Sequence, residues 1–381
     1  MSTNHSKSLQ VLMMPDYRHD NLYQTLLAKS LKTENAKVIF PQGYRRVLPL
    51  VRAVRDNSCD VLHLHWLTPY IRSNTWLGSL FYSSKFLIDI FLVHCLGVRV
   101  VWTVHNQIGH NSQFPKLDLW RRKSIAKLVD KIIVHNSCTV DLLIQNWKIE
   151  RSKIAVIPHG HYRDAYHPAI DRAEARKQLD LPLNGRIYLN LGMLRPYKGI
   201  ENLLDVWRSD RDLFQGDTLL IAGKPLDEDY GLKLTELAKS ISGVILHSDF
   251  IESDRIHLFY SAADVVILPF TNILTSGSLI LAMSYGKPVI APKQGGISET
   301  VGRDNDLLYD SNEADALLRA LEKSTHIDLE QLSQQIVTSC EKLDWNLIAN
   351  ETAKTYIIKS YNNAKSNVKN IEINSISNCT R

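Results

Sequence analysis

The sequence predicts an α/β fold made of two domains, each with a parallel β-sheet at its centre. The chain has 381 residues, of which 44% are hydrophobic and 22% are charged. That length exceeds one ordinary core, and that composition is typical of a globular protein. Short, continuously apolar runs alternate with segments of helical spacing in both halves. Such runs are typical of strands buried on both faces of a parallel sheet, with helices as right-handed crossovers.

Both halves carry the same alternation of elements. Apolar runs in the first half predict strands at 9–14, 37–40, 60–66, 99–106, 131–136 and 153–160. Helical spacing there predicts helices at 21–32 and 48–57. The second half predicts strands at 186–192, 217–223, 243–250, 264–270 and 287–292, and helices at 200–208, 253–262 and 278–285.

The domain limits follow from composition. We expect the first domain over 1–165 and the second over 166–342, because the segment between the two sets of strands is polar and charged and contains Pro168 and Pro182. Residues 343–362 have helical spacing and are expected to pack back toward the first domain. Residues 363–381 are rich in Asn, Ser and Lys, which predicts a mobile tail.

Cysteine usage and charge restrict the setting. The five cysteines are scattered and odd in number, which argues against a disulfide scaffold or a zinc site and for a reducing, cytoplasmic compartment. No secretory signal is expected, because residues 1–15 contain no long apolar run. Residues 1–170 hold 22 Lys+Arg and 11 Asp+Glu (+11), whereas residues 171–381 hold 23 and 29 (−6). The basic half favours an anionic partner, namely a membrane surface, a lipid-linked phosphate or nucleic acid, although a solvated basic surface explains it as well.

A first candidate site lies where a predicted strand ends and a helix begins, at 192–204. Gly192 permits a tight turn, and Arg195 and Lys198 place two cations near the helix N-terminus. Backbone N–H groups and the helix dipole favour a diphosphate at such a place, and the cations would offset its charge. A connecting loop with ordinary surface charges is the alternative.

A second candidate site lies at 269–299. Ser276, Gly277 and Ser278 open an apolar helix, so backbone amides can approach a phosphate while the hydroxyls donate to it or cap the helix. Glu299 follows a second glycine turn at 295–296. Helix capping plus a turn would explain the same residues. Since open parallel sheets bind ligands at the carboxyl ends of their strands, two such sheets facing each other suit the transfer of a group from a donor to an acceptor.

These motifs, in this order, resemble the retaining glycosyltransferases of the GT-B fold, often called the glycosyltransferase 4 family. The resemblance covers about 11–361 and rests on VIPHG at 156–160, TVHN at 103–106, RPYKG at 195–199, AMSYGKPVIA at 282–291 and GGISE at 295–299. It implies two Rossmann-like domains facing across a cleft. It also implies a hexosyltransferase that moves a hexose from a nucleotide diphosphate sugar to a glycan or lipid-linked acceptor, in polysaccharide or glycoconjugate biosynthesis.

The resemblance also implies roles for residues. Its diphosphate site maps onto Gly192, Arg195, Lys198, Ser276, Gly277 and Ser278. Its nucleobase and ribose region maps onto Phe250, Ile251 and Glu299, and its histidine near the reacting sugar carbon maps onto His105. It implies no metal and no cofactor other than the nucleotide sugar. His63 and His65 alternate on one strand, but no carboxylate or cysteine completes a metal site at useful spacing.

The sequence departs from that family at three places. The arginine that the family carries directly after the first glycine is Met193 here, with Arg195, two residues on, as its candidate substitute. Two glutamates that the family carries eight positions apart are Ile273 and Leu281 here, so the donor sugar, the base and the stereochemical course stay open, with GDP-mannose and UDP-hexoses both possible. The family's glycine-rich loop after the first strand is also missing. An inverting enzyme would need a general base, for which Asp16 and His19 are the candidates. A retaining enzyme would instead use front-face departure guided by His105.

Two segments suggest contact with a membrane. Residues 76–96 are aromatic and apolar but are interrupted by Lys85 and Asp89, which argues against a spanning helix. Residues 114–131 combine Trp120 with several Lys and Arg, which suits an anionic interface. A buried helix and an exposed amphipathic helix, respectively, are the alternatives.

Together these features predict a peripheral enzyme on the inner face of the membrane. A sugar-nucleotide epimerase of the same fold and a non-catalytic nucleotide-sugar-binding protein are the competing functions. Nucleic acid is not expected as a partner, because the sequence contains no recognisable nucleic-acid-binding module.

Overall fold

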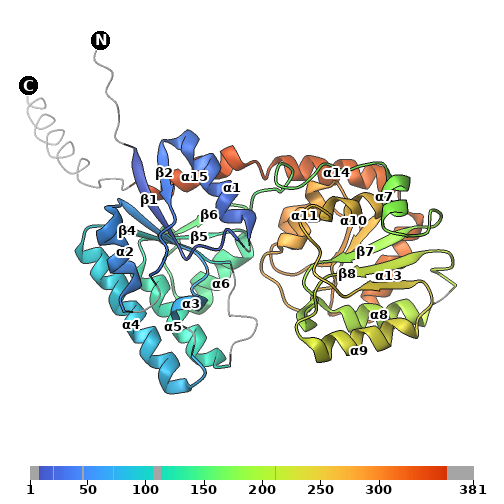
Figure 1. The fold of residues 1–381 in the computed structure, drawn as a ribbon, viewed down its shortest axis with the longest axis horizontal. Coiled ribbons are helices and arrows are strands. Elements are labelled where there is room, and N and C mark those ends of the chain that lie inside the picture. Colours follow the sequence, from blue (N-terminus) through green and yellow to red (C-terminus); the bar gives the residue numbers. More distant parts are fainter. Residues whose placement is uncertain are drawn as a thin grey trace, which may run out of the picture.

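The computed structural model describes residues 8–19, 21–44, 47–71, 73–105, 113–210 and 212–357. It contains two parallel β-sheets of six strands, side by side and each covered by helices (Figure 1). The predicted α/β class with two Rossmann-like sheets is therefore confirmed. The tail predicted at 363–381 lies outside the described residues, as does Asn106 at the end of one predicted strand.

The first sheet has the strand order β2-β1-β3-β4-β5-β6. Its strands are β1 (Leu9–Met14), β2 (Ala36–Ile39), β3 (Val61–Leu64), β4 (Arg99–Thr103), β5 (Lys131–Val134) and β6 (Ile154–Val156). The accompanying helices are α1 (Leu22–Leu31), η1 (Lys32–Glu34), α2 (Pro49–Asn57), α3 (Thr68–Ile71), α4 (Trp76–Cys95), α5 (Pro115–Leu128), α6 (Ser137–Trp147) and η2 (Arg151–Lys153). The order reverses between β1 and β3, and a parallel sheet binds ligands beside such a reversal.

The second sheet has the order β12-β11-β10-β7-β8-β9. Its strands are β7 (Ile187–Leu191), β8 (Thr218–Ala222), β9 (Val244–His247), β10 (Val265–Ile267), β11 (Val289–Pro292) and β12 (Leu308–Tyr309). The helices are α7 (Arg172–Gln178), η3 (Pro196–Lys198), α8 (Ile200–Ser209), α9 (Glu228–Lys239), α10 (Ile256–Ala262), α11 (Gly277–Ser284), α12 (Ile297–Val301), α13 (Ala316–His326) and α14 (Leu329–Glu341). Here the order reverses between β7 and β10, so the loops after these two strands meet at the carboxyl edge.

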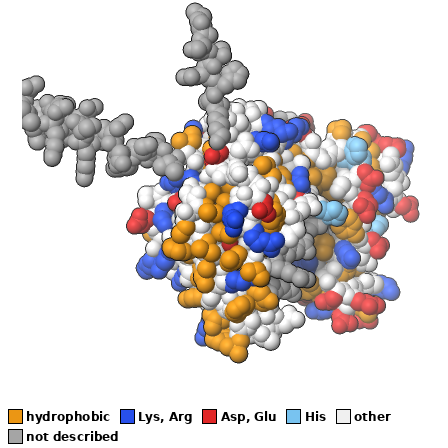
Figure 2. Space-filling view, turned by 60° about the vertical axis from the view of Figure 1, so that its left-hand side comes forward, with side chains coloured by type: hydrophobic (Ala, Val, Ile, Leu, Met, Phe, Trp, Pro, Cys, Tyr) orange, Lys and Arg blue, Asp and Glu red, His pale blue; other side chains and the backbone are white. Residues whose placement is uncertain are grey.

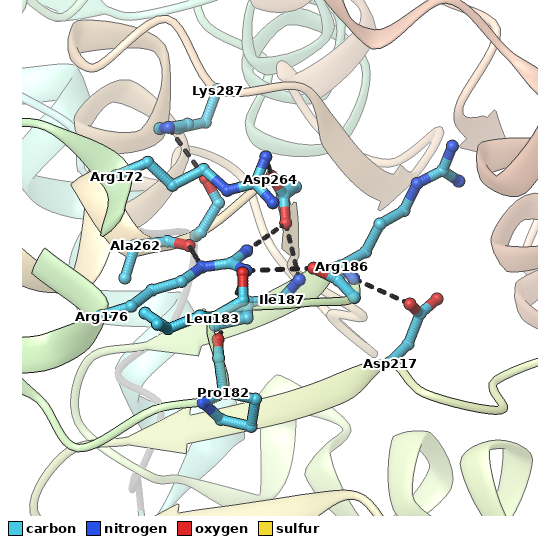
Figure 3. A network of polar contacts seen from close by, with 12 residues as sticks. Arg172, Arg176, Pro182, Leu183, Arg186, Ile187, Asp217, Ala262, Asp264 and Lys287 are labelled. Carbon is cyan, nitrogen blue, oxygen red and sulfur yellow. Dashed lines mark hydrogen bonds and ion pairs between the residues drawn. The ribbon is translucent and has the colours of Figure 1, made fainter. Parts of the chain in front are cut away.

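A polar network fixes the opposite, amino edge of the second sheet (Figure 3). The Asp264 carboxylate accepts hydrogen bonds from Arg176 Nη2 at 2.7 Å and from the Ile187 backbone N–H at 2.7 Å, and it pairs with Arg172 at 3.1 Å. The Arg176 side chain is fully buried and also donates to the carbonyls of Ala262, Pro182, Leu183 and Gly185. Because each nitrogen of this guanidinium donates to at least one named acceptor, the network joins α7 to the starts of β7 and β10.

The chain returns to the first sheet through helix α15 (Trp345–Tyr356), which packs against α1. Its inward side chains join the core cluster of the first sheet, with Val11, Met13 and Tyr23 among the members. The Thr355 carbonyl accepts a hydrogen bond from Arg99 Nε at 3.0 Å. Trp345 Nε1 donates to the His161 carbonyl at 2.7 Å, so the start of α15 contacts the segment between the two sheets. The domain limits at 165 and 342 stay predictions.

Candidate functional site

The carboxyl edges of the two sheets meet each other. Asn136, which follows β5, donates to the Leu274 carbonyl at 2.9 Å from its amide. The Ser137 N–H donates to Glu299 at 2.8 Å, and the Ser137 hydroxyl donates to the other carboxylate oxygen at 3.1 Å. A narrow space of about 10 Å³ lies beside these contacts, lined by His135 and His159 on one side and by Thr275 and Ser276 on the other, among other residues. The loops after β5 and β6 thus face the start of α11.

Gly192, Lys198 and Ser278 come together at the reversal in the second sheet. Gly192 follows β7 with a φ of 124°, a conformation that favours glycine. A Cβ atom at Gly192 would lie 2.7 Å from Lys198 Nζ and 3.4 Å from Ser278 Oγ. Any larger residue would therefore fill the space between the ammonium, the hydroxyl and the backbone. The structure brings together these three residues of the predicted diphosphate site.

Lys198 carries its charge in a buried place. Its side chain is 5% exposed, and no ion pair joins it to a carboxylate among the described residues. Burial, reinforced by repulsion from Arg195, lowers the pKa of Lys198 from 10.5 to about 8. At neutral pH the side chain is therefore still an ammonium ion, and no carboxylate in the described part of the chain neutralises it. Such a group is expected to take up an anion from outside.

The start of α11 supplies further donors. Ser276 caps this helix, because its Oγ accepts a hydrogen bond from the Leu279 N–H at 3.1 Å. A Cβ at Gly277 would lie 3.6 Å from the Tyr162 hydroxyl, so this turn lies against the linker between the sheets. Arg195, half-buried, stands just before η3. The first turn of α11 therefore presents backbone N–H groups next to Lys198, which is a suitable environment for phosphate oxygens.

On the first sheet, a row of histidines follows successive strands. His65 follows β3, His105 follows β4, His135 follows β5 and His159 follows β6. His65 Nδ1 lies 3.3 Å from His105 Nε2, and His105 Nδ1 lies 3.3 Å from His135 Nε2. The row ends at the Ile157 carbonyl, 2.9 Å from His135 Nδ1. We call His65, His105 and His135 the histidine row.

The carbonyl sets the direction of the histidine row. Because a carbonyl only accepts, His135 Nδ1 carries a proton and its Nε2 presents a lone pair. His105 Nδ1 must then donate and its Nε2 accept, and His65 Nδ1 must donate in turn. The remaining atom, His65 Nε2, is buried and has no hydrogen-bond partner among the described residues. Every ring is thus held in one neutral tautomer.

Burial keeps the histidine row uncharged. It lowers the pKa of His135 to about 4 and the pKa values of His65 and His105 well below 6.5, and the neighbouring histidines lower the latter two further. Both ring nitrogens of His105 are engaged by other histidines, so its side chain is a positioned group rather than a free one. Its contact with the donor sugar stays a prediction.

A second set of bonds lies beside this row. His63 Nδ1 is hydrogen-bonded to the Tyr356 hydroxyl at 2.7 Å, and His63 Nε2 to the Thr103 hydroxyl at 2.7 Å. These bonds connect α15 to the centre of the sheet. His159 Nδ1 bonds the Gly160 carbonyl at 2.8 Å, and its Nε2 lies 3.3 Å from the Tyr162 hydroxyl. Within the part of the chain that the structure describes, no group of three or more His, Cys, Asp or Glu side chains is arranged to hold a metal ion.

The two candidate bases lie in the loop after β1, at the reversal of the first sheet. Asp16 accepts hydrogen bonds at 2.9 Å from both Arg18 Nε and Nη2, and at 3.2 Å from Gln42. These contacts, the Arg18 side chain foremost, lower the pKa of Asp16, so it is ionised at neutral pH. His19 is exposed in the same loop.

Comparison with known proteins identifies the family. The model of the family "Glycosyl transferases group 1" matches residues 171–338, and that of "Glycosyltransferase Family 4" matches residues 31–162. The chain belongs to the group 1 glycosyltransferases. It is similar to a GDP-mannose:glycolipid 4-beta-D-mannosyltransferase of Xanthomonas campestris pv. campestris, with 28% identity over 272 residues, which are 69% of this chain and 70% of that protein. It is also similar to a lipopolysaccharide 1,2-N-acetylglucosaminetransferase of Salmonella typhimurium, with 27% identity covering 86% of this chain and 90% of that one.

Solved structures share the GT-B fold of this glycosyltransferase. The Anabaena protein HepE in complex with UDP aligns with a TM-score of 0.69 at 16% identity, covering 91% of this chain and 99% of HepE. A sucrose-phosphate synthase from Thermosynechococcus elongatus aligns with a TM-score of 0.67 at 18% identity, covering 92% of this chain and 98% of the other. The expected GT-B architecture is confirmed.

The residues expected to hold the nucleobase and ribose are not all together in this glycosyltransferase. Phe250, 58% exposed, and Ile251 follow β9, whereas Glu299 lies on α12 after β11. Four strand spacings separate β9 from β11, which is about 19 Å. Both oxygens of Glu299 also bind Ser137. The structure therefore places Glu299 at the contact between the sheets and leaves Phe250 and Ile251 near the opposite edge.

Sequence reasoning missed His135, His159 and Tyr162. The signal was present, because the strands β3, β4, β5 and β6 are each followed within three residues by a histidine. Neighbouring parallel strands end at the same edge, so residues that follow them at similar offsets meet there. Considering the four strands together would have predicted a cluster at the edge that faces the donor site.

Proposed function

We propose that this glycosyltransferase transfers a hexose from a nucleotide diphosphate sugar, held at Gly192, Lys198 and Ser278, to a glycan or lipid-linked acceptor held against the first sheet. The observation that carries the proposal is the buried Lys198 ammonium, which lacks a carboxylate partner among the described residues and adjoins a helix N-terminus at the strand reversal. The activities named for the Xanthomonas and Salmonella relatives, a mannosyl and an N-acetylglucosaminyl transfer, support it.

The chemistry needs stabilisation of the leaving nucleoside diphosphate. Lys198, Arg195 and the amides at the start of α11 would offset its developing charge, so the proposal requires no metal ion and no cofactor. GDP-mannose and UDP-hexoses are both candidate donors. The name of the Xanthomonas relative favours the first, and the UDP and UDP-glucose complexes of HepE favour the second.

The acceptor side depends on the stereochemical course. In an inverting reaction, the ionised Asp16 or the exposed His19 would take the proton of the acceptor hydroxyl. In a retaining reaction, the nucleoside diphosphate would leave on the face where the acceptor arrives, beside His105. The histidine row fixes the His105 ring for that position.

We further propose a cytoplasmic enzyme that lies on the inner membrane surface through α4 and α5. Helix α4 is the one described helix that is long and apolar enough to cross a membrane by length and composition, and 33% of its most apolar stretch is buried. Its Asp89 is buried and accepts from the N–H groups of Leu50 and Val51 at 2.8 and 2.9 Å, which supports packing over spanning. The outer face exposes large apolar side chains, at Trp76, Leu77, Phe81, Tyr82, Ile88 and Phe91.

Charge complements this apolar face. The adjacent helix α5 carries the exposed cations Lys116 and Lys127 and the indole of Trp120, which is 44% exposed. Figure 2 shows apolar side chains gathered over the lower part of the first domain, with Lys and Arg side chains among them. Apolar and basic groups together favour an anionic lipid surface.

A donor panel tests the proposed function. Purified protein would be incubated with UDP-, GDP- and dTDP-sugars, with and without a membrane extract, and nucleoside diphosphate release measured. We expect release from one donor, stimulated by the extract and lost in Lys198→Ala. Sugar-nucleotide isomerisation without any acceptor would indicate an epimerase, and binding without turnover a binding protein. Either result would contradict the proposal.

A further inference from the structure

A groove separate from the donor site runs along the edge of the first sheet. It lies between α1 and β2, the outermost strand, and has a volume of about 620 Å³. Ligand sites commonly have volumes of about 300–1,000 Å³. The groove extends from Arg18 and Phe40, which follow β1 and β2, to Asn35 and Ser8 at the other end of these strands. It therefore begins at the carboxyl edge, where the acceptor side of the reaction is expected.

The charged residues that line the groove all have the same sign. Four cations line it, Arg18, Lys29, Lys32 and Lys37, and no Asp or Glu does. The three lysines are exposed, and no ion pair involves them among the described residues. Of the nearby carboxylates, Asp16 pairs with one of these four cations, Arg18, at 2.9 Å, whereas Glu34 accepts from the Asn350 amide at 3.0 Å. The three lysines are therefore the groove cations that a ligand can neutralise.

The cations are spread along the groove rather than directed at one point. Lys29 and Lys32 lie three positions apart at the end of α1, Lys37 lies on the opposite wall, and Arg18 lies at the far end. A helix of ten residues is about 15 Å long. A single phosphate could meet only one or two of these groups, whereas an extended ligand with repeated negative charges meets all of them.

The other lining groups suit sugar rings. Ser8 and Thr25 offer hydroxyls, while Ala28, Ala36 and Val38 provide small apolar surfaces. Sugar rings present hydroxyls at their rims and C–H groups on their faces, so both kinds of surface are used. At the carboxyl end, the Arg18 guanidinium lies 3.9 Å above the Phe40 ring and binds Asp16 at 2.9 Å. The groove thus leads to a candidate base.

We propose that the groove between α1 and β2 binds an acidic oligosaccharide, as the part of the acceptor that precedes the sugar being extended. This inference deepens the proposed function and rests on it, because the oligosaccharide is an acceptor only if the protein transfers a hexose. The binding of the acidic glycan itself depends only on the groove. A carboxylate-bearing or phosphate-bearing chain would satisfy the same cations, and the groove residues keep it beside Asp16.

Calorimetric titration with defined probes tests this inference. Tetragalacturonate is the acidic probe, maltotetraose the neutral probe of equal length, and tetraglutamate the peptide of equal charge, all at low ionic strength. We expect the wild type to bind tetragalacturonate at least about tenfold more tightly than either other probe. Lys29→Gln combined with Lys37→Gln should weaken it about tenfold, which is about 1.4 kcal/mol. The matched control, Lys148→Gln with Lys239→Gln, removes two exposed lysines elsewhere and should bind as the wild type does.

Several results would overturn the inference. These are equal affinity of the groove variant and the wild type, equal affinity for maltotetraose, or tighter binding of tetraglutamate, which would indicate a peptide groove. GDP and UDP binding would be measured on the same samples. Loss of tetragalacturonate binding in the groove variant with nucleotide binding intact supports the groove. Absence of nucleotide binding in the wild type would contradict the proposed function while the glycan data still decide on the groove.

Discussion

At the scale of single residues, Lys198 shows how function and stability oppose each other. Its burial lowers the pKa to about 8, against 10.5 for an ordinary lysine. Between these values the unfolded chain binds more protons than the folded one, so the free energy of unfolding should rise as the pH increases from 8 to 10.5. Replacement by an apolar residue of similar length removes the cost of the buried charge.

We therefore predict that Lys198→Met stabilises the ligand-free protein by about 1–3 kcal/mol at pH 7 and removes its rise in stability above pH 8. Urea unfolding at pH 7 and pH 9.5 measures both effects. Lys239→Met, at an exposed lysine of α9, is the control and should change neither. Destabilisation of Lys198→Met would show that this ammonium is already satisfied inside the protein.

Nucleotide affinity should depend on the same proton. Lys198 is cationic below pH 8 and neutral above it, so affinity for a nucleoside diphosphate should fall with rising pH beyond about 8. Titrations at pH 7, 8 and 9 measure this dependence. The affinity of Lys198→Met should be low and independent of pH over the same interval, and an equal pH dependence in both proteins would point to another group.

The histidine row makes a second prediction about pH. His135 has a folded pKa of about 4 against 6.5 ordinarily, so its contribution to stability is complete above pH 6.5 and is lost as the pH falls toward 4. Between pH 7 and pH 5 this loss is about 2 kcal/mol for His135 alone. Urea unfolding at the two values should show at least that loss in the wild type, because burial lowers the pKa values of His65 and His105 too, and a smaller one in His135→Gln. His167→Gln, at an exposed histidine, should behave as the wild type does.

Sequence could predict some of these residues and not others. Gly192 and Lys198 are close in sequence, and the turn that brings them together is encoded locally by a glycine after a strand. Their grouping with Ser278 was predicted by the family resemblance, whose diphosphate site maps onto all three residues. For His105, the histidines after neighbouring strands indicate a cluster, but which ring nitrogens meet depends on the strand order of the whole sheet and could not be deduced from the sequence.

At the scale of elements, most strands begin within one residue of the predicted start and end before the predicted end. The run at 131–136 continues beyond β5 because Asn136 caps α6, with its side-chain oxygen accepting from the Thr139 N–H at 3.0 Å. The run at 99–106 likewise extends beyond β4, which ends at Thr103. The short strand β12 escaped prediction, because two residues carry no recognisable pattern.

Helix α4 is ambiguous in sequence, since a buried helix and a membrane-bound helix are both apolar. The structure shows which side chains face outward, and it supports a test of the proposed membrane surface. Phe81→Ser with Phe91→Ser should weaken sedimentation with phosphatidylglycerol vesicles at least about tenfold, because both rings are more than half exposed and would enter the lipid.

The control for this test exchanges exposed leucines of the second domain, Leu183→Ser with Leu232→Ser, and should sediment as the wild type does. Vesicles of phosphatidylcholine alone should bind the wild type more weakly, since they lack the negative charge that complements α5. Equal sedimentation of the α4 variant and the wild type would contradict the membrane surface.

At the scale of the whole molecule, a polar network holds the amino edge of the second sheet, and the carboxyl edge carries the candidate donor site. The fully buried Arg176 joins α7, β7 and β10 through Asp264. Arg176→Met would leave Asp264 with the exposed Arg172 as its remaining cation, and we predict a loss of about 3 kcal/mol in the free energy of unfolding. Arg208→Met breaks an exposed pair with Asp205 and should cost less than about 1 kcal/mol. Similar losses in both would show that the network contributes little.

The proposed donor site requires that the second sheet hold a nucleoside diphosphate at Lys198. Calorimetric titration of GDP, UDP and dTDP into the wild type, Lys198→Met and Lys239→Met tests this most directly. We expect the wild type and Lys239→Met to bind one nucleotide equally. Lys198→Met should bind it about tenfold to a hundredfold more weakly, as expected for one lost charged hydrogen bond. Undiminished binding by Lys198→Met, or binding of none of the three nucleotides by the wild type, would contradict it.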